Sequence, residues 1–400
     1  MLKNKIEELI NKKIMISNET LLALSFCLPI FFSNLSEILL AFGFSSFTIL
    51  SYIILYLINI TLFFKLLIKK PIKTISVIFV FGLIILFSCI ISNDVIGYIF
   101  NFGNKNIESI LQSNIILFIT RCLIPFIAFI NKIDVYKFTN LLTKYSFILV
   151  IIYIIMNVVN FSKYNYATNY MNNAYMAFIP VALVYGNSFV NKKLFKYFLS
   201  IFAGFFVIIS GSRGAALCMI GFIGIYHIII GKFTYRKFIL SLSLILCFAI
   251  LILNLENILY FLSNTFEKIG ISTRLIDLFN GKEEGVFQLS GRDKIYNNVI
   301  HEINFFGSGL FYDRVIMSGV YVHNLLIEVI LNFGYFFGTL ILILFFIKTA
   351  KSIFIIHNKP IISIWAPIII IIFGIKYMVS GSYLISQDFW FLIGIVFFLK

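Results

Sequence analysis

The chain is a succession of long apolar runs separated by short polar connections. A helix of about 20 residues crosses the roughly 30 Å hydrocarbon core of a bilayer, and the runs have that length. The chain is 60% hydrophobic and 12% charged, with a mean hydropathy of +1.00, so it has too little polar surface to cover a soluble globule. We therefore predict an all-α polytopic membrane protein and exclude the soluble enzyme classes.

The spacing of the runs predicts about 12 transmembrane helices. We expect them near residues 21–42, 46–67, 74–92, 113–130, 145–160, 172–190, 196–210, 213–231, 237–255, 322–347, 361–379 and 384–399. The chain then divides into a tail, two helical regions and one long loop. Their bounds are 1–20 for the N-terminal tail, 21–255 for helices one to nine, 256–321 for the loop between helices nine and ten, and 322–400 for helices ten to twelve.

Basic residues cluster in every second connection along the chain. Membrane proteins retain such clusters on the cytoplasmic side, so both termini are predicted to be cytoplasmic. The formal net charge of +15 is thereby explained by topology, and we expect no nucleic-acid partner. The clusters include Lys12 and Lys13, Lys69 and Lys70, Lys132 and Lys137, Lys192 and Lys193, Lys232 and Arg236, and Lys348 and Lys351.

The connection at 256–321 faces the outside of the membrane by this alternation. It is much longer than the other connections and contains turn signals such as Asn280-Gly281. The sequence Ser290-Gly291-Arg292-Asp293 predicts the start of a helix, because Ser290 can cap it and Asp293 lies in its first turn.

Arginine is scarce, with six Arg against 26 Lys, and its placement is selective. The guanidinium group binds phosphate through two parallel hydrogen bonds, which an ammonium group cannot do. Pairing with neighbouring acids such as Asp313 is the alternative for Arg274 and Arg314, whereas Arg213 has no acid nearby in the sequence. Four of the six are predicted to lie outside: Arg213, Arg274, Arg292 and Arg314.

Charged residues inside the apolar runs are costly to bury and mark functional sites. Glu37, Lys376, Glu328 and Asp388 all fall toward the outer leaflet in the predicted topology, and Arg121 lies deeper. This placement predicts a polar cavity that opens to the outside. Salt bridges among these residues are the alternative explanation.

Signals for metal or cofactor binding are missing from the sequence. There is no HExxH motif, no Cys/His cluster and no Gly-rich phosphate loop, and the four His are spread over different elements. We therefore expect no metal, no cofactor and no ATP-driven activity.

Two polar segments stand out among the membrane helices. Ser210-Gly211-Ser212-Arg213-Gly214 predicts a tight external turn, and Val322-His323-Asn324 opens a helix that runs on through Asn332-Phe333-Gly334. Ser290-Gly291-Arg292 precedes Phe306-Gly307-Ser308-Gly309 upstream of that helix. In this order and topology the chain resembles the bacterial O-antigen polymerase and O-antigen ligase superfamily, most closely over 200–345.

The resemblance implies a multi-pass glycosyltransferase of the bacterial cytoplasmic (inner) membrane. Such an enzyme polymerises undecaprenyl-diphosphate-linked oligosaccharide repeat units into O-antigen (lipopolysaccharide) or capsule polysaccharide of the cell envelope, with its active site facing the periplasm. The expected partners are the lipid-linked donor and acceptor, the bilayer and other polysaccharide-assembly membrane proteins. At the matching positions the resemblance associates Arg213, Arg292 and His323 with catalysis.

The chemistry of these residues suits metal-independent, inverting transfer. Arg213, Arg292 and Arg121 would bind the diphosphate leaving group, and His323 would act as the general base. Glu37, Glu328 and Asn324 would support the site, with Glu328 orienting the His323 ring. A role of His323 as an interfacial anchor is the alternative.

Other functions remain open at this point. A ligase would transfer the glycan to another acceptor with the same motifs, and the sequence does not separate it from a polymerase. A polysaccharide flippase or other transporter would also be large, basic and polytopic, but the long outer loop disfavours it. A non-catalytic scaffold gives no reason for arginine to be concentrated outside.

Overall fold

The computed structural model shows an all-helical protein. Its described residues contain no strand, which confirms the predicted all-α class. The residues that the structure describes are 16–44, 48–91, 113–162, 170–210, 212–229, 239, 292–317, 319–359 and 361–398.

The N-terminal helices follow the first predicted runs closely. Helix α2 begins at Asn18 because Ser17 caps it, with the Ser17 hydroxyl accepting a hydrogen bond of 3.2 Å from the backbone N–H of Thr20. The helices are α2 (Asn18–Ala41), α3 (Thr48–Lys69) and α4 (Pro71–Ile91), followed by the π-helical turn η1 (Phe118–Leu123) and α7 (Ile124–Ile130).

The central helices are α8 (Val135–Ser162), α9 (Tyr170–Val190), α10 (Leu194–Ile209) and α11 (Arg213–Ile229). Helix α8 begins ten residues before the predicted run at 145–160. The reason is an amphipathic first section, in which Val135, Phe138 and Leu142 are buried while Lys137 is exposed. The predicted helix at 237–255 lies outside the described residues.

The C-terminal third contains both short and long helices. The predicted helix after Ser290 is confirmed, because α15 begins at Arg292. The helices are α15 (Arg292–Ile300), α16 (Tyr312–Ile316), α17 (Leu325–His357), α18 (Trp365–Ile371), the π-helical turn η2 (Ile372–Lys376), α19 (Tyr377–Val379) and α20 (Gln387–Phe398).

Five helical segments among the described residues are long and apolar enough to cross a membrane. Shorter apolar helices accompany them, so the chain has the character of a membrane protein. The five are Asn18–Ala41, Tyr52–Lys69, Ser113–Ile130, Val135–Asn160 and Leu325–His357.

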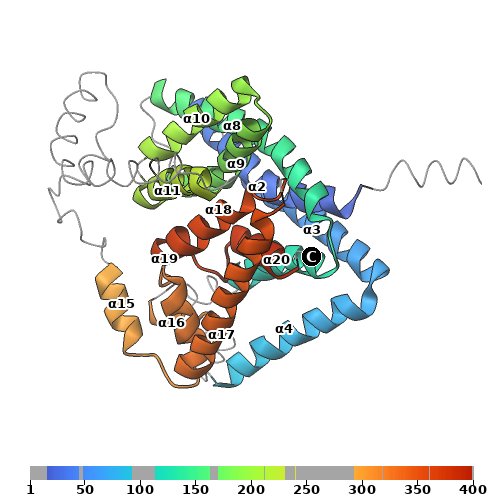
Figure 1. Ribbon diagram of the computed structural model, residues 1–400. Coiled ribbons are helices and arrows are strands. Elements are labelled where there is room, and N and C mark those ends of the chain that lie inside the picture. The colour runs from blue at the N-terminus through green and yellow to red at the C-terminus, as the bar shows by residue number, and fades with distance from the viewer. Residues whose placement is uncertain are drawn as a thin grey trace, which may run out of the picture.

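The helices pack into one bundle (Figure 1). Helix α2 packs along α8 and α3, and α10 packs along α9, while α20 lies against α7 and α11 lies against α18. Helices α8 to α11 gather on one side in Figure 1, α15 to α17 gather on the other, and α18 to α20 lie between them. Segments far apart in the sequence therefore meet in the middle of the bundle.

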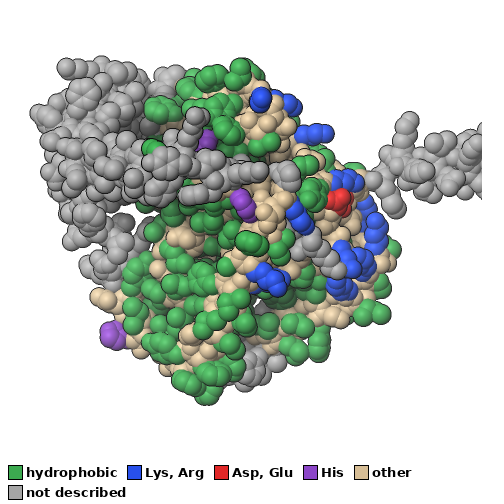
Figure 2. Space-filling view, in the orientation of Figure 1, with side chains coloured by type: hydrophobic (Ala, Val, Ile, Leu, Met, Phe, Trp, Pro, Cys, Tyr) green, Lys and Arg blue, Asp and Glu red, His purple; other side chains and the backbone are tan. Residues whose placement is uncertain are grey.

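Lysines from two predicted cytoplasmic regions, 69–73 and 132–144, lie at one end of the bundle, here called the basic end. The Lys70 ammonium donates to the carbonyl of Asn131 at 2.6 Å, and Lys137 lies 3.6 Å from Glu19. Figure 2 shows Lys and Arg concentrated along one edge of an otherwise mostly hydrophobic face. The predicted topology requires such a grouping, because these connections belong to the same side of the membrane.

Candidate functional site

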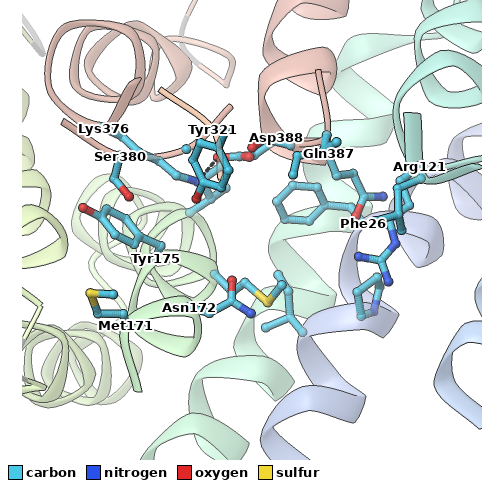
Figure 3. Close-up of a pocket in the computed structure, with 18 residues that line it drawn as sticks. Phe26, Arg121, Met171, Asn172, Tyr175, Tyr321, Lys376, Ser380, Gln387 and Asp388 are labelled. Atoms are coloured by element: carbon cyan, nitrogen blue, oxygen red, sulfur yellow. Dashed lines mark hydrogen bonds and ion pairs between the residues drawn. The ribbon is translucent and has the colours of Figure 1, made fainter. Parts of the chain in front are cut away.

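A cavity of about 440 Å³ lies where α2, η1, α9, η2 and α20 approach one another (Figure 3). Apolar side chains of α2 and α9, including Phe26, Ile30 and Ile179, form part of its wall. The polar and charged side chains that line the cavity are Arg121, Asn172, Tyr175, Tyr321, Lys376, Ser380, Ser386, Gln387 and Asp388.

Lys376 and Asp388 form an ion pair at the edge of this cavity. The Lys376 ammonium donates to Oδ2 of Asp388, and the Tyr377 hydroxyl donates to Oδ1 of the same carboxylate at 2.8 Å. The pair connects η2 with α20. Of the two explanations offered for these charges, a mutual salt bridge is thus confirmed for this pair, and the pair also lines a cavity.

Arg121 reaches the cavity from a different side (Figure 3). Its guanidinium carbon lies 4.7 Å from the centre of the Tyr52 ring, a cation–π contact. Within the described ranges of the chain no acid forms an ion pair with Arg121. The positive charge of Arg121 is therefore held by an aromatic ring rather than cancelled by a carboxylate.

A chain of hydrogen bonds fixes the helical turn that carries Arg121. The π-helical turn η1 frees the carbonyl of Thr120, which accepts a hydrogen bond of 2.7 Å from the Asn59 amide. Asn59 in turn accepts from Ser25 at 2.6 Å, and Gln387 donates to the Ser25 carbonyl at 2.8 Å. These contacts tie η1 to α20, which carries Asp388.

The Ser212-Arg213-Gly214 turn packs against the cavity wall. Helix α11 begins at Arg213, and the Ser212 side chain is buried beneath its first turn. A Cβ atom on Gly214 would lie 1.7 Å from the Tyr175 hydroxyl, so only glycine allows this contact. The backbone of the turn thus touches a cavity residue, while the Arg213 side chain lies outside what the structure describes.

His323 lies beside the cavity next to Tyr321. The two rings are 4.0 Å apart between centres, and Tyr321 lines the cavity. The backbone of His323 has a φ of 60°, in the left-handed region that non-glycine residues seldom adopt and that is concentrated at functional sites. The predicted general base is thus placed at the border of the cavity.

Asn324 caps the N-terminus of α17, a role that its position just before the apolar run indicates. Its side-chain oxygen caps α17 by accepting from the backbone N–H groups of Leu326 at 3.0 Å and Ile327 at 3.2 Å. Its amide donates to the carbonyl of Met378 at 3.2 Å. The cap fixes the start of α17 against α19 and so fixes the backbone next to His323.

Arg314 forms the centre of a fully buried ion cluster. It donates to Asp313 at 2.6 Å, to Glu328 at 2.9 Å and to Ser382 at 2.6 Å. Burial lowers the pKa of Arg314, but the carboxylates of Asp313 and Glu328 raise it by more, so its pKa lies above the ordinary value. The predicted alternative for Arg314, pairing with a neighbouring acid, is confirmed.

The two carboxylates predicted to support the site lie apart, with Glu328 in the Arg314 cluster and Glu37 on α2. Glu328 Oε1 accepts from Arg314 and Ser382, and Oε2 accepts from the backbone N–H of Tyr383 at 3.2 Å. Its orientation of the His323 ring stays a prediction. Glu37 is 5% exposed on α2 and is not one of the residues that line the cavity.

The backbone of the Phe306-Gly307-Ser308-Gly309 segment packs directly against the backbone of α17 at a break in that helix. The helix is interrupted at Gly334, whose φ of 77° is non-helical. The backbone N–H of Ser308 donates to the Leu331 carbonyl at 2.8 Å, and a Cβ on Gly334 would lie 2.3 Å from the Gly307 nitrogen. Both glycines therefore allow a close backbone contact that anchors the 306–309 segment on α17.

Of the two remaining arginines predicted to lie outside, Arg292 is described by its backbone alone and Arg274 is not described. Arg292 begins α15, which packs against α16 and α17, but its side chain is outside the described residues, as is all of Arg274. Within the described part of the chain no three His, Cys, Asp or Glu residues are grouped as a metal site requires.

Arg121, Lys376 and Asp388 are predicted from the sequence as buried charges, and all three line the cavity, although the sequence indicates no role for Lys376 or Asp388. Asn172 and Tyr175 of α9 and Gln387 of α20 also line the cavity, but they are neutral and carry no sequence signal for it. Comparison of the chain with protein-family models, with curated proteins and with solved structures gives no significant match.

Proposed function

We propose that the protein is a membrane glycosyltransferase that polymerises undecaprenyl-diphosphate-linked oligosaccharide repeat units into an O-antigen- or capsule-type polysaccharide. The observation that carries this proposal is the meeting of distant segments at one cavity. Arg121 lines it, the Ser-Arg-Gly turn contacts it through Tyr175, and His323 adjoins it through Tyr321. These segments include the two that carry the resemblance.

The proposed reaction displaces the diphosphate from the anomeric carbon of the donor sugar. An acceptor hydroxyl attacks that carbon while its proton passes to His323, a base of suitable strength near neutral pH. The bond between the carbon and the diphosphate oxygen breaks, and Arg213 and Arg292 stabilise the departing charge. Attack from the opposite face inverts the anomeric centre, and the arginines supply the positive charge without a metal.

The arrangement of charged residues supports a site on the outer side of the bacterial cytoplasmic membrane. Lysines from the predicted cytoplasmic connections gather at the basic end. Tyr321 and Asp388, which line the cavity, belong to connections or helix starts that the same alternation places outside. The lipid-linked substrates would then reach the cavity from the outer leaflet.

Incubation of the purified protein with lipid-linked repeat units tests the proposal. The expected product is a ladder of longer lipid-linked glycans. Transfer of the glycan only to an added acceptor that carries no undecaprenyl diphosphate would identify a ligase instead. Movement of the lipid-linked substrate across a vesicle membrane without glycan growth would identify a transporter and contradict the proposal.

A further inference from the structure

The two basic residues that line the cavity share an unusual backbone setting. Arg121 lies in η1 and Lys376 ends η2, and these are the two π-helical turns among the described residues. A π-helical turn is rare and is frequently found at functional sites. The fold therefore departs from regular helix at both cations of the cavity.

The charges around the cavity do not balance. Two basic side chains, Arg121 and Lys376, and one acidic side chain, Asp388, line the cavity. Lys376 is paired with Asp388, whereas Arg121 has no acid partner in the described part of the chain, so one positive charge is left over. An excess positive charge among membrane helices is costly unless water or an anion stabilises it. The cavity is thus suited to an anionic group.

The rest of the wall indicates which kind of anion fits. Phe26, Pro29 and Ile30 of α2 and Met176 and Ile179 of α9 form an apolar surface. A ligand that buries apolar surface here while it presents an anion to Arg121 and Lys376 is an amphiphile. A free phosphate would leave the apolar surface without a partner.

We infer that this cavity binds the phosphate or diphosphate group of a lipid-linked ligand, with Lys376 and Arg121 supplying positive charge from its opposite sides. Asp388 is a positioning residue, because it holds the Lys376 ammonium while its other oxygen is fixed by Tyr377. Tyr175 lies between Lys376 and the Ser-Arg-Gly turn. Lys376 Nζ is 5.5 Å from the centre of the Tyr175 ring, and the Tyr175 hydroxyl lies against Gly214. The identification of the lipid as undecaprenyl diphosphate rests on the proposed function.

Binding measured without turnover tests this inference. Undecaprenyl diphosphate that carries no sugar is added to the full-length protein in nanodiscs of neutral lipid, and complexes are counted by native mass spectrometry. Arg121→Met and Lys376→Met should each weaken binding by about 10- to 100-fold, the loss expected for one charge-assisted contact. Lys348→Met is the matched control, because this lysine contacts Phe397 outside the cavity and its loss should change nothing.

Two further measurements separate charge recognition from structural damage. The variant Lys376→Met/Asp388→Asn leaves no unpaired carboxylate, so it should fold and still bind weakly. Binding of undecaprenol, which has no phosphate, should be the same in wild type and variants. Wild-type affinity in Arg121→Met and Lys376→Met would overturn the inference, and equal binding of inorganic pyrophosphate would overturn the assignment of a lipid-linked ligand.

The binding assay also distinguishes this inference from the proposed function. Diphosphate binding that depends on Lys376, in a protein that never extends a glycan, would uphold the cavity site and contradict the glycosyltransferase. Glycan extension by the wild type with unchanged binding in both variants would uphold the function and contradict the cavity site.

Discussion

Replacement of Gly214 by alanine tests the contact between the Ser-Arg-Gly turn and the cavity wall. The added Cβ would lie 1.7 Å from the Tyr175 hydroxyl and 2.9 Å from the ring carbon that bears it. Such an overlap forces the Tyr175 ring or helix α11 to move, which costs about 1–3 kcal/mol. Alanine in a helix stabilises the fold by roughly 0.5–1 kcal/mol relative to glycine. The net loss of unfolding free energy should therefore be smaller than the cost of the overlap alone.

Gly224 provides a matched control on the same helix. A Cβ at Gly224 would have no atom within 4 Å, so Gly224→Ala should be neutral or stabilising. Tyr175→Phe removes the atom at 1.7 Å and leaves the nearest ring carbon at 2.9 Å. The double variant Gly214→Ala/Tyr175→Phe should therefore recover most of the stability that Gly214→Ala loses.

The assay is a double-mutant cycle on unfolding free energies, measured by titration with sodium dodecyl sulfate in mixed micelles. We expect a favourable coupling energy of about 1–2 kcal/mol between positions 214 and 175. If Gly214→Ala is as stable as Gly224→Ala, or if Tyr175→Phe brings no recovery, then the turn does not pack on Tyr175.

The remaining predictions concern the ion cluster, the base and the orientation. Arg314→Met leaves two buried carboxylates without their cation, so it should lower the unfolding free energy by about 3–5 kcal/mol; a loss near zero would contradict the cluster. His323→Ala should abolish transfer but not donor binding, and EDTA should not inhibit the wild type, whereas inhibition reversed by magnesium would show a metal. In a background without native cysteines, His301→Cys should react with an impermeant maleimide in intact cells and Lys193→Cys should not; the reverse pattern would invert the topology.

The sequence predicts the all-helical class and the position of most described helices, because the apolar runs signal them directly, while the count of 12 transmembrane helices stays a prediction. The start of α15 was found from Ser290 and Arg292, and the pairing of Arg314 with Asp313 was anticipated because these residues are adjacent. The start of α8 was missed because its first section is amphipathic and carries Lys137 and Lys144. Hydropathy averaged over a window does not detect such a section.

The cavity itself was only partly predictable. The cost of burying charge singled out Arg121, Lys376 and Asp388, but their common place depends on the packing of α20 against α7 and of η2 against α11. The π-helical turns η1 and η2 lie inside apolar runs, and the hydropathy pattern does not distinguish them from regular helix. The break at Gly334 was singled out as part of a motif, and its reason became visible only with the Gly307 backbone against it.

The most direct test of the central claim compares wild type with Arg213→Lys in the polymerisation reaction. If Arg213 binds the departing diphosphate through its planar fork, lysine should lose most of the rate despite its equal charge. Loss of one such contact corresponds to about 2–4 kcal/mol, or roughly 30- to 1,000-fold in rate. The account predicts long glycans from the wild type and almost none from Arg213→Lys at matched expression. Wild-type chain lengths from the lysine variant would contradict it.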